Sequence, residues 1–235
     1  MKRPVLLVVA MCLALAGIAG CTAAKIEDFH TIDAEDAEGV EVDIVMGIGQ
    51  LWITGGADVL MNARFLYESE SWKPSVSYRV ADRMGQLEVR QPNVSGHRMM
   101  SNFSYEWDLQ FGRDVPVDLM TVDLGVGTAD LRIGDLPLRN LELKLGVGDV
   151  AVDLSGPRSE DLNVSVEGGV GRCVLDLPGD VGVRVEVDRG IAHVDVSDLH
   201  RRGDEYVNDL YGDSDVTVNL KVAAGVGQIV VRAGR

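Results

Sequence analysis

Basic residues are scarce in this chain of 235 residues, and their scarcity excludes a class of partner. Lys and Arg number 22 against 37 Asp and Glu, which gives a formal net charge of −15 at pH 7. Without Lys2 and Arg3, which lie in an N-terminal segment discussed below, 20 basic and 37 acidic residues leave a net charge of −17. Nucleic acids and anionic lipid headgroups repel such a surface, so we expect neither as a partner.

Cysteine and histidine are also rare, which leaves little material for disulfides or metal sites. The three cysteines are Cys12, Cys21 and Cys173. We expect the first to be removed and the second to be modified, so only Cys173 remains as a thiol and no intramolecular disulfide can form. The four histidines show no metal-ligand spacing. We therefore expect no metal site and no cofactor.

Aromatic residues are few and are unevenly placed. All three Trp and all four Phe come before residue 112, and only Tyr206 and Tyr211 follow Arg113. A narrow stack of strands filled by Val and Leu has little room for rings. The rings from Trp52 to Phe111 are therefore expected to be mostly core, although this part of the chain is also where a ring could stack on a ligand.

The N-terminus has the organisation of an export signal. Lys2 and Arg3 precede an uncharged apolar run over residues 5–19. This run is shorter than the roughly 20 apolar residues that a transmembrane helix needs. The run ends at Ile18-Ala19-Gly20-Cys21, which resembles the bacterial lipobox. The resemblance implies a signal peptide over residues 1–20, a diacylglyceryl group on Cys21, and a protein anchored by lipid to a bacterial membrane in the cell envelope. The alternative is an ordinary signal peptide followed by a chance cysteine. Residues 21–36 are expected to be a lipidated tether, which is polar and acidic from Thr31 to Asp36.

A sequence pattern centred on glycines is repeated six times in the rest of the chain. Each copy has two alternating apolar positions, a Gly-x-Gly or near match, and two more alternating apolar positions. The first glycines are Gly47, Gly125, Gly146, Gly169, Gly190 and Gly225, with spacings of 78, 21, 23, 21 and 35 residues. All 24 residues at five and three positions before, and four and six after, these glycines are hydrophobic. At a hydrophobic background of 46%, chance gives this result roughly once in a hundred million before any allowance for freedom in alignment.

The repeat predicts an all-β fold of stacked coils. Alternation on both sides of the glycines predicts two half-buried strands per copy. Because one copy has nothing against which to bury its apolar stripe, successive copies should stack as a parallel β-solenoid with coils of about 21 residues. The glycines should form tight corners and stack without Cβ crowding. No helix and no Lys-Ser/Thr follows them, which argues against a phosphate-binding loop.

The irregular spacings predict the domain organisation. We expect residues 116–235 to form the solenoid and residues 37–115 to form an irregular N-terminal β cap. Within the cap, residues 76–80 and 87–89 should be strands around a turn at Met84-Gly85. The extra residues between the last two copies, 200–215, should be a loop, and Arg232 and Arg235 should place charge at the far end of the stack.

Several segments together resemble the toast-rack family of bacterial envelope proteins. They are residues 46–56, Trp72-Lys73-Pro74 with Tyr78, Trp107-Asp108-Leu109, residues 115–119, the Gly-Val-Gly copies, and residues 206–211. The C-terminal part is similar to the C-terminal β domain of regulators that respond to cell-wall-active antibiotics, and related domains carry the label putative adhesin. The resemblance implies the β fold but attaches no catalytic residues to these motifs.

No constellation for catalysis stands out. Asp130 and Asp195 occupy the same outward column, but with two coils between them they should lie roughly 14 Å apart, beyond the reach of paired-carboxylate chemistry. His193 and Asp195 share one face of a strand, yet no serine or cysteine is placed for activation, and Cys173 lies in an inward column.

We therefore expect a non-enzymatic envelope lipoprotein that binds a protein or an envelope polymer through an outer strand face or residues 200–215. Its role would be in adhesion, scaffolding or envelope stress. The alternatives are a carbohydrate-binding or carbohydrate-active β-helix protein, which would need exposed Trp or Tyr beside two carboxylates, and a domain that only assembles an oligomer.

Overall fold

The computed structural model describes residues 25–92, 105–188, 190–223 and 225–234. These residues form β-strands with one short 3-10 helix, η1 (Glu70–Trp72). The strands of the cap region are β1 (Ile26–Ile32), β2 (Gly39–Ala57), β3 (Met61–Tyr67), β4 (Ser75–Ala81), β5 (Met84–Arg90) and β6 (Glu106–Gly112). The later strands are β7 (Val117–Arg132), β8 (Asn140–Asp153), β9 (Leu162–Glu167), β10 (Val170–Leu177), β11 (Gly182–Asp188), β12 (His193–Ser197), β13 (His200–Arg202), β14 (Glu205–Val207), β15 (Thr217–Ala223) and β16 (Val226–Ala233).

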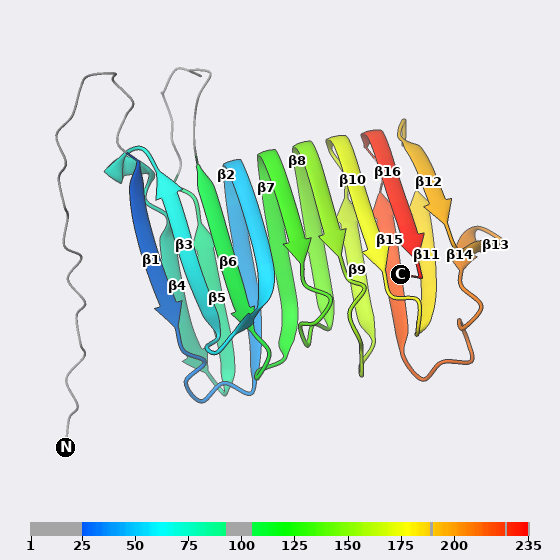
Figure 1. Ribbon diagram of the computed structural model, residues 1–235, viewed down its shortest axis with the longest axis horizontal. Coiled ribbons are helices and arrows are strands. Elements are labelled where there is room, and N and C mark those ends of the chain that lie inside the picture. Colours follow the sequence, from blue (N-terminus) through cyan, green and yellow to red (C-terminus); the bar gives the residue numbers. More distant parts are fainter. Residues whose placement is uncertain (1–24, 93–104, 189, 224, 235) are drawn as a thin grey trace.

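The strands form two layers joined along one edge by the glycine bends (Figure 1). One layer has the order β4-β5-β2-β7-β8-β9-β15-β11-β14-β13, and the other has the order β1-β3-β6-β2-β7-β8-β10-β16-β12. Strands β2, β7 and β8 run through the bend and belong to both layers. Neighbouring repeat copies pair in parallel, as the solenoid prediction requires.

The predicted inward columns form the core between the layers. Leu131 pairs with Val152, Val152 with Leu175, and Leu175 with Val231, and all four side chains are buried. Of the 24 column residues, only Val187, Val194 and Val196 are not fully buried. All three belong to the fifth copy at the end of the stack, which has another copy on one side only.

The order of the last two copies differs from the prediction. The final copy, β15 and β16, lies between the fourth copy, β9 and β10, and the fifth, β11 and β12. Asp130 and Asp195 are therefore separated by three strands of the layer, β8, β10 and β16, rather than by two coils. Arg232 does not close the far end but reaches Asp176 of the fourth copy at 3.5 Å. Arg235 lies outside the described residues.

Residues 200–215 return the chain from the fifth copy, at the end of the stack, to the position of the final copy. The predicted loop contains the antiparallel hairpin of β13 and β14, and β14 pairs with β11 at the free edge of one layer. Arg184 of β11 donates to both carboxylate oxygens of Glu205, at 2.8 and 2.6 Å. Because this hairpin returns the chain from the outermost copy, the final copy can enter the vacant position beside β9 and β10.

The bends explain the repeated glycines. The second glycine of the bend has φ between +133° and +151° in five of the copies, a region that side chains other than glycine rarely adopt. A Cβ on Gly148 would lie 1.7 Å from the carbonyl oxygen of Gly127 in the adjacent copy. Both requirements, backbone conformation and close stacking, exclude a side chain.

At the beginning of the stack, the Gln91 side chain and the Tyr105 backbone take the place of a preceding copy. The buried side chain of Gln91 accepts from the Ile48 amide at 2.8 Å and donates to the Ile48 carbonyl at 3.1 Å. The Tyr105 carbonyl accepts from the Gln50 amide at 2.8 Å. These contacts satisfy backbone groups of the β2 bend that, in the other bends, are satisfied by the neighbouring copy.

Two further predictions about the cap region are wrong in detail. Residues 26–32 are not a tether, because β1 pairs along its whole length with β3 and packs Ile26 and Ile32 against the core. The turn of the β4-β5 hairpin lies at Asp82-Arg83, not at Met84-Gly85. Both residues have positive φ, 52° and 66°, which is the conformation of a type I′ turn.

Candidate functional site

The outer face of the β1-to-β12 layer presents polar and apolar side chains in regular rows. One row crosses the strands through Arg64, Asp108, Trp52, Asp130, Ala151, Val174, Val230 and Asp195, each paired with its neighbour in the adjacent strand. The row follows from the alternation of the strands, which sends every second side chain outward.

Trp52 is the one Trp on this face, and we call its surroundings the Trp52 patch. The patch is a shallow depression of about 380 Å³ lined by Trp52, Thr54, Arg64, Glu106, Asp108, Asp130 and Arg132. Asp108 of β6 and Asp130 of β7 lie in register on either side of the ring. An apolar ring between two carboxylates, with two guanidinium groups nearby, is a chemically mixed surface suited to a polar ligand with one apolar face.

Ion pairs hold the charged groups of the patch in place. Arg132 donates to both oxygens of Asp130, at 3.2 and 2.9 Å. This contact raises the pKa of Arg132. Arg64 contacts Glu27 of β1, and Lys25 contacts Glu106 at 3.2 Å. These ion pairs fix the positions of the charged groups, which suits the binding of a polar ligand.

The other Trp residues are core. Trp107 is fully buried, with its ring centroid 5.4 Å from that of Phe65, and Trp72 is buried against Tyr105. Burial raises the pKa of Tyr105, whose hydroxyl donates to the Trp72 carbonyl. The prediction that most rings are core is confirmed. Trp52 is half-buried, and no Trp or Tyr among the described residues is fully exposed. The cluster of exposed Trp or Tyr that a carbohydrate site was expected to show is therefore not found in that part of the chain.

The remaining candidates from the sequence do not form a catalytic site. His193 Nε2 lies 3.0 Å from Asp195, and Gln228 also donates to Asp195, at 3.0 Å; the Gln228 contact, with a smaller effect from His193, lowers the pKa of that carboxyl. Both His193 and Asp195 are at least half exposed. Cys173 is buried, and burial raises the pKa of its thiol to about 12, so it is a poor nucleophile. No group of three metal-binding side chains occurs within the described residues. Cys21 lies outside them.

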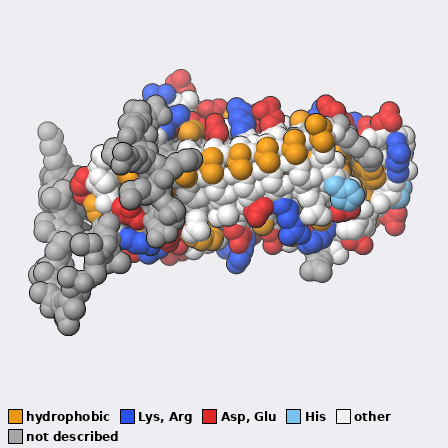
Figure 2. All heavy atoms as spheres, turned by 90° about the horizontal axis from the view of Figure 1, so that it is seen from above, with side chains coloured by type: hydrophobic (Ala, Val, Ile, Leu, Met, Phe, Trp, Pro, Cys, Tyr) orange, Lys and Arg blue, Asp and Glu red, His pale blue; other side chains and the backbone are white. Residues whose placement is uncertain are grey.

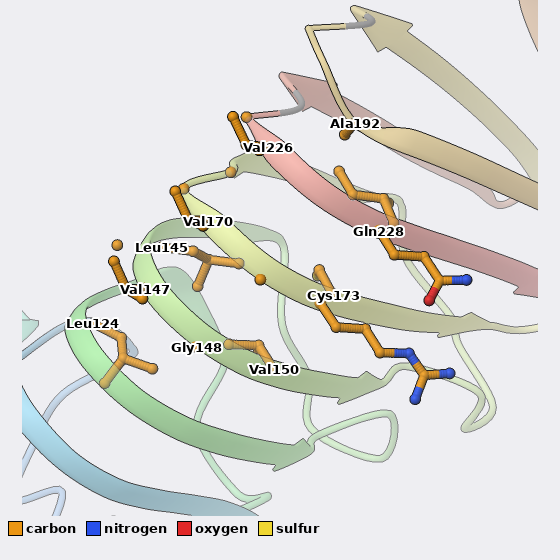
Figure 3. A pocket seen from close by; sticks show the side chains of 17 residues that line it. Leu124, Leu145, Val147, Gly148, Val150, Val170, Cys173, Ala192, Val226 and Gln228 are labelled. Carbon is orange, nitrogen blue, oxygen red and sulfur yellow. The ribbon is translucent and has the colours of Figure 1, made fainter.

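A narrow cavity opens under the bends of β8, β10 and β16 (Figure 3). Its volume is about 30 Å³, and Leu145, Val150 and Cys173 lie along it. Two features account for the space: Gly168 stands where earlier copies carry Leu124 and Leu145, and the fifth copy has Ala192 in place of the second glycine, with its ladder beginning only at His193. The cavity is about as large as one water molecule, which excludes a sugar or an acyl chain.

Comparison with known proteins identifies the family to which this chain belongs. The family model described as the N-terminal domain of toast_rack (DUF2154) matches residues 22–176. The chain belongs to the toast-rack family. Among curated proteins, none matches the chain in sequence. Within the described residues no helix has the length and apolarity to cross a membrane.

One solved structure is similar to this chain over nearly its whole length. A putative cell adhesion protein from Clostridium sporogenes is 30% identical, with a TM-score of 0.85 over 90% of this chain and 100% of that one. A putative adhesin from Bacteroides fragilis is 14% identical, with a TM-score of 0.30 over 89% of this chain and 98% of that one. Only the first of these is similar enough to support an inference about this toast-rack protein.

Proposed function

We propose that this protein is a non-enzymatic, lipid-anchored component of the bacterial cell envelope that binds an envelope partner through the outer face of the β1-to-β12 layer. The observation that carries the proposal is the Trp52 patch, a ring flanked by two carboxylates on a sheet face whose strands pair in register. The name of the Clostridium sporogenes protein, a putative cell adhesion protein, supports an adhesive role. The Ile18-Ala19-Gly20-Cys21 run supports the anchor.

The stacked strands suit such a role. Each copy contributes one step of about 4.8 Å to a flat face, so side chains on the face are held at fixed intervals. A preorganised surface binds without a large ordering cost, which favours recognition of an extended, repetitive partner.

The anchor is tested by the substitution Cys21→Ser. We expect the wild-type protein to be found in the membrane fraction of the producing cell and to be released only by detergent, because buried acyl chains contribute about 0.8 kcal/mol for each CH₂. Cys21→Ser removes the thiol that would carry the lipid, so this variant should be found in the soluble fraction. The matched control is Cys173→Ala, which changes a buried thiol and should leave the protein in the membrane fraction. Equal partition of wild type and Cys21→Ser would refute the anchor.

A saccharide is the second candidate partner, and the same patch favours it. Aromatic rings stack on the apolar faces of sugars, and carboxylates accept from their hydroxyl groups. A depression of 380 Å³ lies within the ordinary range of small-ligand sites. Because Asp130 is paired with Arg132, we propose binding without cleavage.

The substitution Trp52→Ala tests both partners. Trp72 and Trp107 are buried, so a change in Trp emission on titration with soluble cell-wall glycan fragments or with an isolated envelope protein would report on Trp52. Because Trp52→Ala removes this reporter, binding by the variants is measured by calorimetry. We expect Trp52→Ala to weaken binding about tenfold, which corresponds to about 1.4 kcal/mol. Val174→Ala, in the same outward row, is the control and should bind as wild type does. Equal binding by both variants would exclude the patch.

A further inference from the structure

A straight row of exposed aliphatic side chains runs along the glycine bends. The middle residues of the six bends are Ile48, Val126, Val147, Val170, Val226 and Ile191 in spatial order, and their side chains are 40% to 85% exposed. The first five pair in register, and the Ile191 amide donates to the Gly225 carbonyl at 3.1 Å. Figure 2 shows the row as a continuous line between charged side chains on either side. We call these six residues the ridge.

Folding alone does not require an apolar ridge. The bend needs its glycines, but the middle residue of the bend is exposed and is not part of the buried core. Threonine would satisfy the β-preference of this position equally well, yet all six copies carry Val or Ile. Of the eight large hydrophobic side chains that are exposed among the described residues, six belong to the ridge. Such a concentration in one line marks a contact surface.

The N-terminal end of the described chain lies at the same edge as the ridge. Ile26 of β1 pairs with Tyr67, the adjacent Leu66 pairs with Glu106, and Glu106 pairs with Gln50, the residue after the bend of β2. Figure 1 shows β1 starting at the edge where the bends lie. Cys21 is four residues before Lys25, a span of at most about 14 Å. The ridge begins three strand steps from β1, also about 14 Å away.

The ridge is poorly suited to a second copy of the chain. Its length of five strand steps is about 24 Å. A band of this length and about 10 Å width is far below the roughly 800 Å² that each partner buries in a stable protein interface. The net charge of −17 also opposes self-association. A lipid surface needs no matched shape, and a neighbouring acyl anchor supplies the second attachment that weak interfacial binding requires.

We propose that the ridge rests on the lipid surface in which the acyl chains of Cys21 are embedded, so that the bends face the membrane and both layers stand out from it. This inference rests on the proposed anchor. Because the protein is acidic, the surface it contacts is zwitterionic rather than anionic. In this orientation the Trp52 patch faces sideways, where an envelope partner can reach it.

The test places a fluorescent probe on the full-length lipidated protein, reconstituted into phosphatidylcholine vesicles that carry a quencher on the lipid chains. Val147→Cys places the label on the ridge, and the matched control Ser159→Cys places it on an exposed loop between β8 and β9 at the opposite edge. Cys173 does not compete for the label, because it is buried and its thiol has a pKa raised to about 12. A second ridge position, Val126→Cys, guards against a local effect of the label.

We expect both ridge labels to lose emission in the vesicles with quencher, and the Ser159→Cys label to keep its emission. Addition of anionic lipid should reduce the loss at the ridge. Emission that is unchanged at all three positions while the protein floats with the vesicles would overturn the ridge proposal and leave the anchor intact. Protein that does not float would overturn both. Self-quenching of the ridge label that grows with protein density would show that the ridge contacts a second copy, which also overturns the proposal.

Discussion

Val152→Asp should unfold the stack. Val152 is buried, and it lies in register between Leu131 and Leu175 in the middle of the parallel core. An unpaired carboxylate at this position has no cation or hydrogen-bond donor from the inward columns, and its burial costs several kcal/mol. A domain is stable by only about 5–15 kcal/mol, so this single change removes a large part of the total.

The effect is measured as a thermal unfolding curve of the variant beside that of the wild type. For a chain of this size each kcal/mol lowers Tm by roughly 2–4 °C, so we expect a fall of about 10 °C or more, or no folded protein at all. Ala151→Asp is the matched control. Ala151 is the exposed neighbour of Val152 in the same strand, so this substitution adds the same charge on the outer face. A melting curve of Val152→Asp that overlies that of Ala151→Asp would show that Val152 does not face a core.

The inward columns could be predicted because burial of one face of a strand produces an alternating sequence pattern. A strand with one buried face must alternate, and the glycines fix the phase of each copy, so residues such as Leu131, Val152 and Leu175 could be aligned without coordinates. The bend could be predicted for a similar reason, since only glycine allows both a positive φ and stacking at backbone distance.

The order of the copies could not be predicted from these columns. Every copy offers the same apolar pattern to its neighbours, so the columns are satisfied equally well whichever copy lies alongside. A second pattern does carry the order. Asn140, Asn163 and Asn219 occupy one position of the third, fourth and sixth copies, while the fifth has Arg184 there. In the structure their amides form a ladder, with contacts of 3.2 and 3.4 Å.

The Trp52 patch was only partly foreseeable. The outward position of Trp52 follows from its place in the column of Asp130 and Asp195. The approach of Asp108 and Arg64 does not, because they come from the cap strands β6 and β3, which lack the repeat and pair antiparallel with each other. The tether prediction failed for a related reason. Residues 26–32 show no apolar alternation, because the partly buried face of edge strand β1 carries Asp28 and His30 between Ile26 and Ile32.

The insertion of the last copy is a strong structural claim, and paired cysteines test it with an all-or-none result. Arg172 of β10, Gln228 of β16 and His193 of β12 occupy one outward row, with Gln228 in the middle. Neighbouring strands place Cα atoms about 4.8 Å apart, within the range of a disulfide, and strands two steps apart place them about 9.6 Å apart, beyond it.

The most direct measurement is therefore disulfide formation, under mild oxidation of the folded protein, in the double variants Arg172→Cys/Gln228→Cys and Arg172→Cys/His193→Cys. We expect the first pair to close into a disulfide and the second to remain reduced, because β16 separates β10 from β12. Closure of the second pair, with the first remaining reduced, would mean that the copies stack in chain order and would contradict the architecture described above.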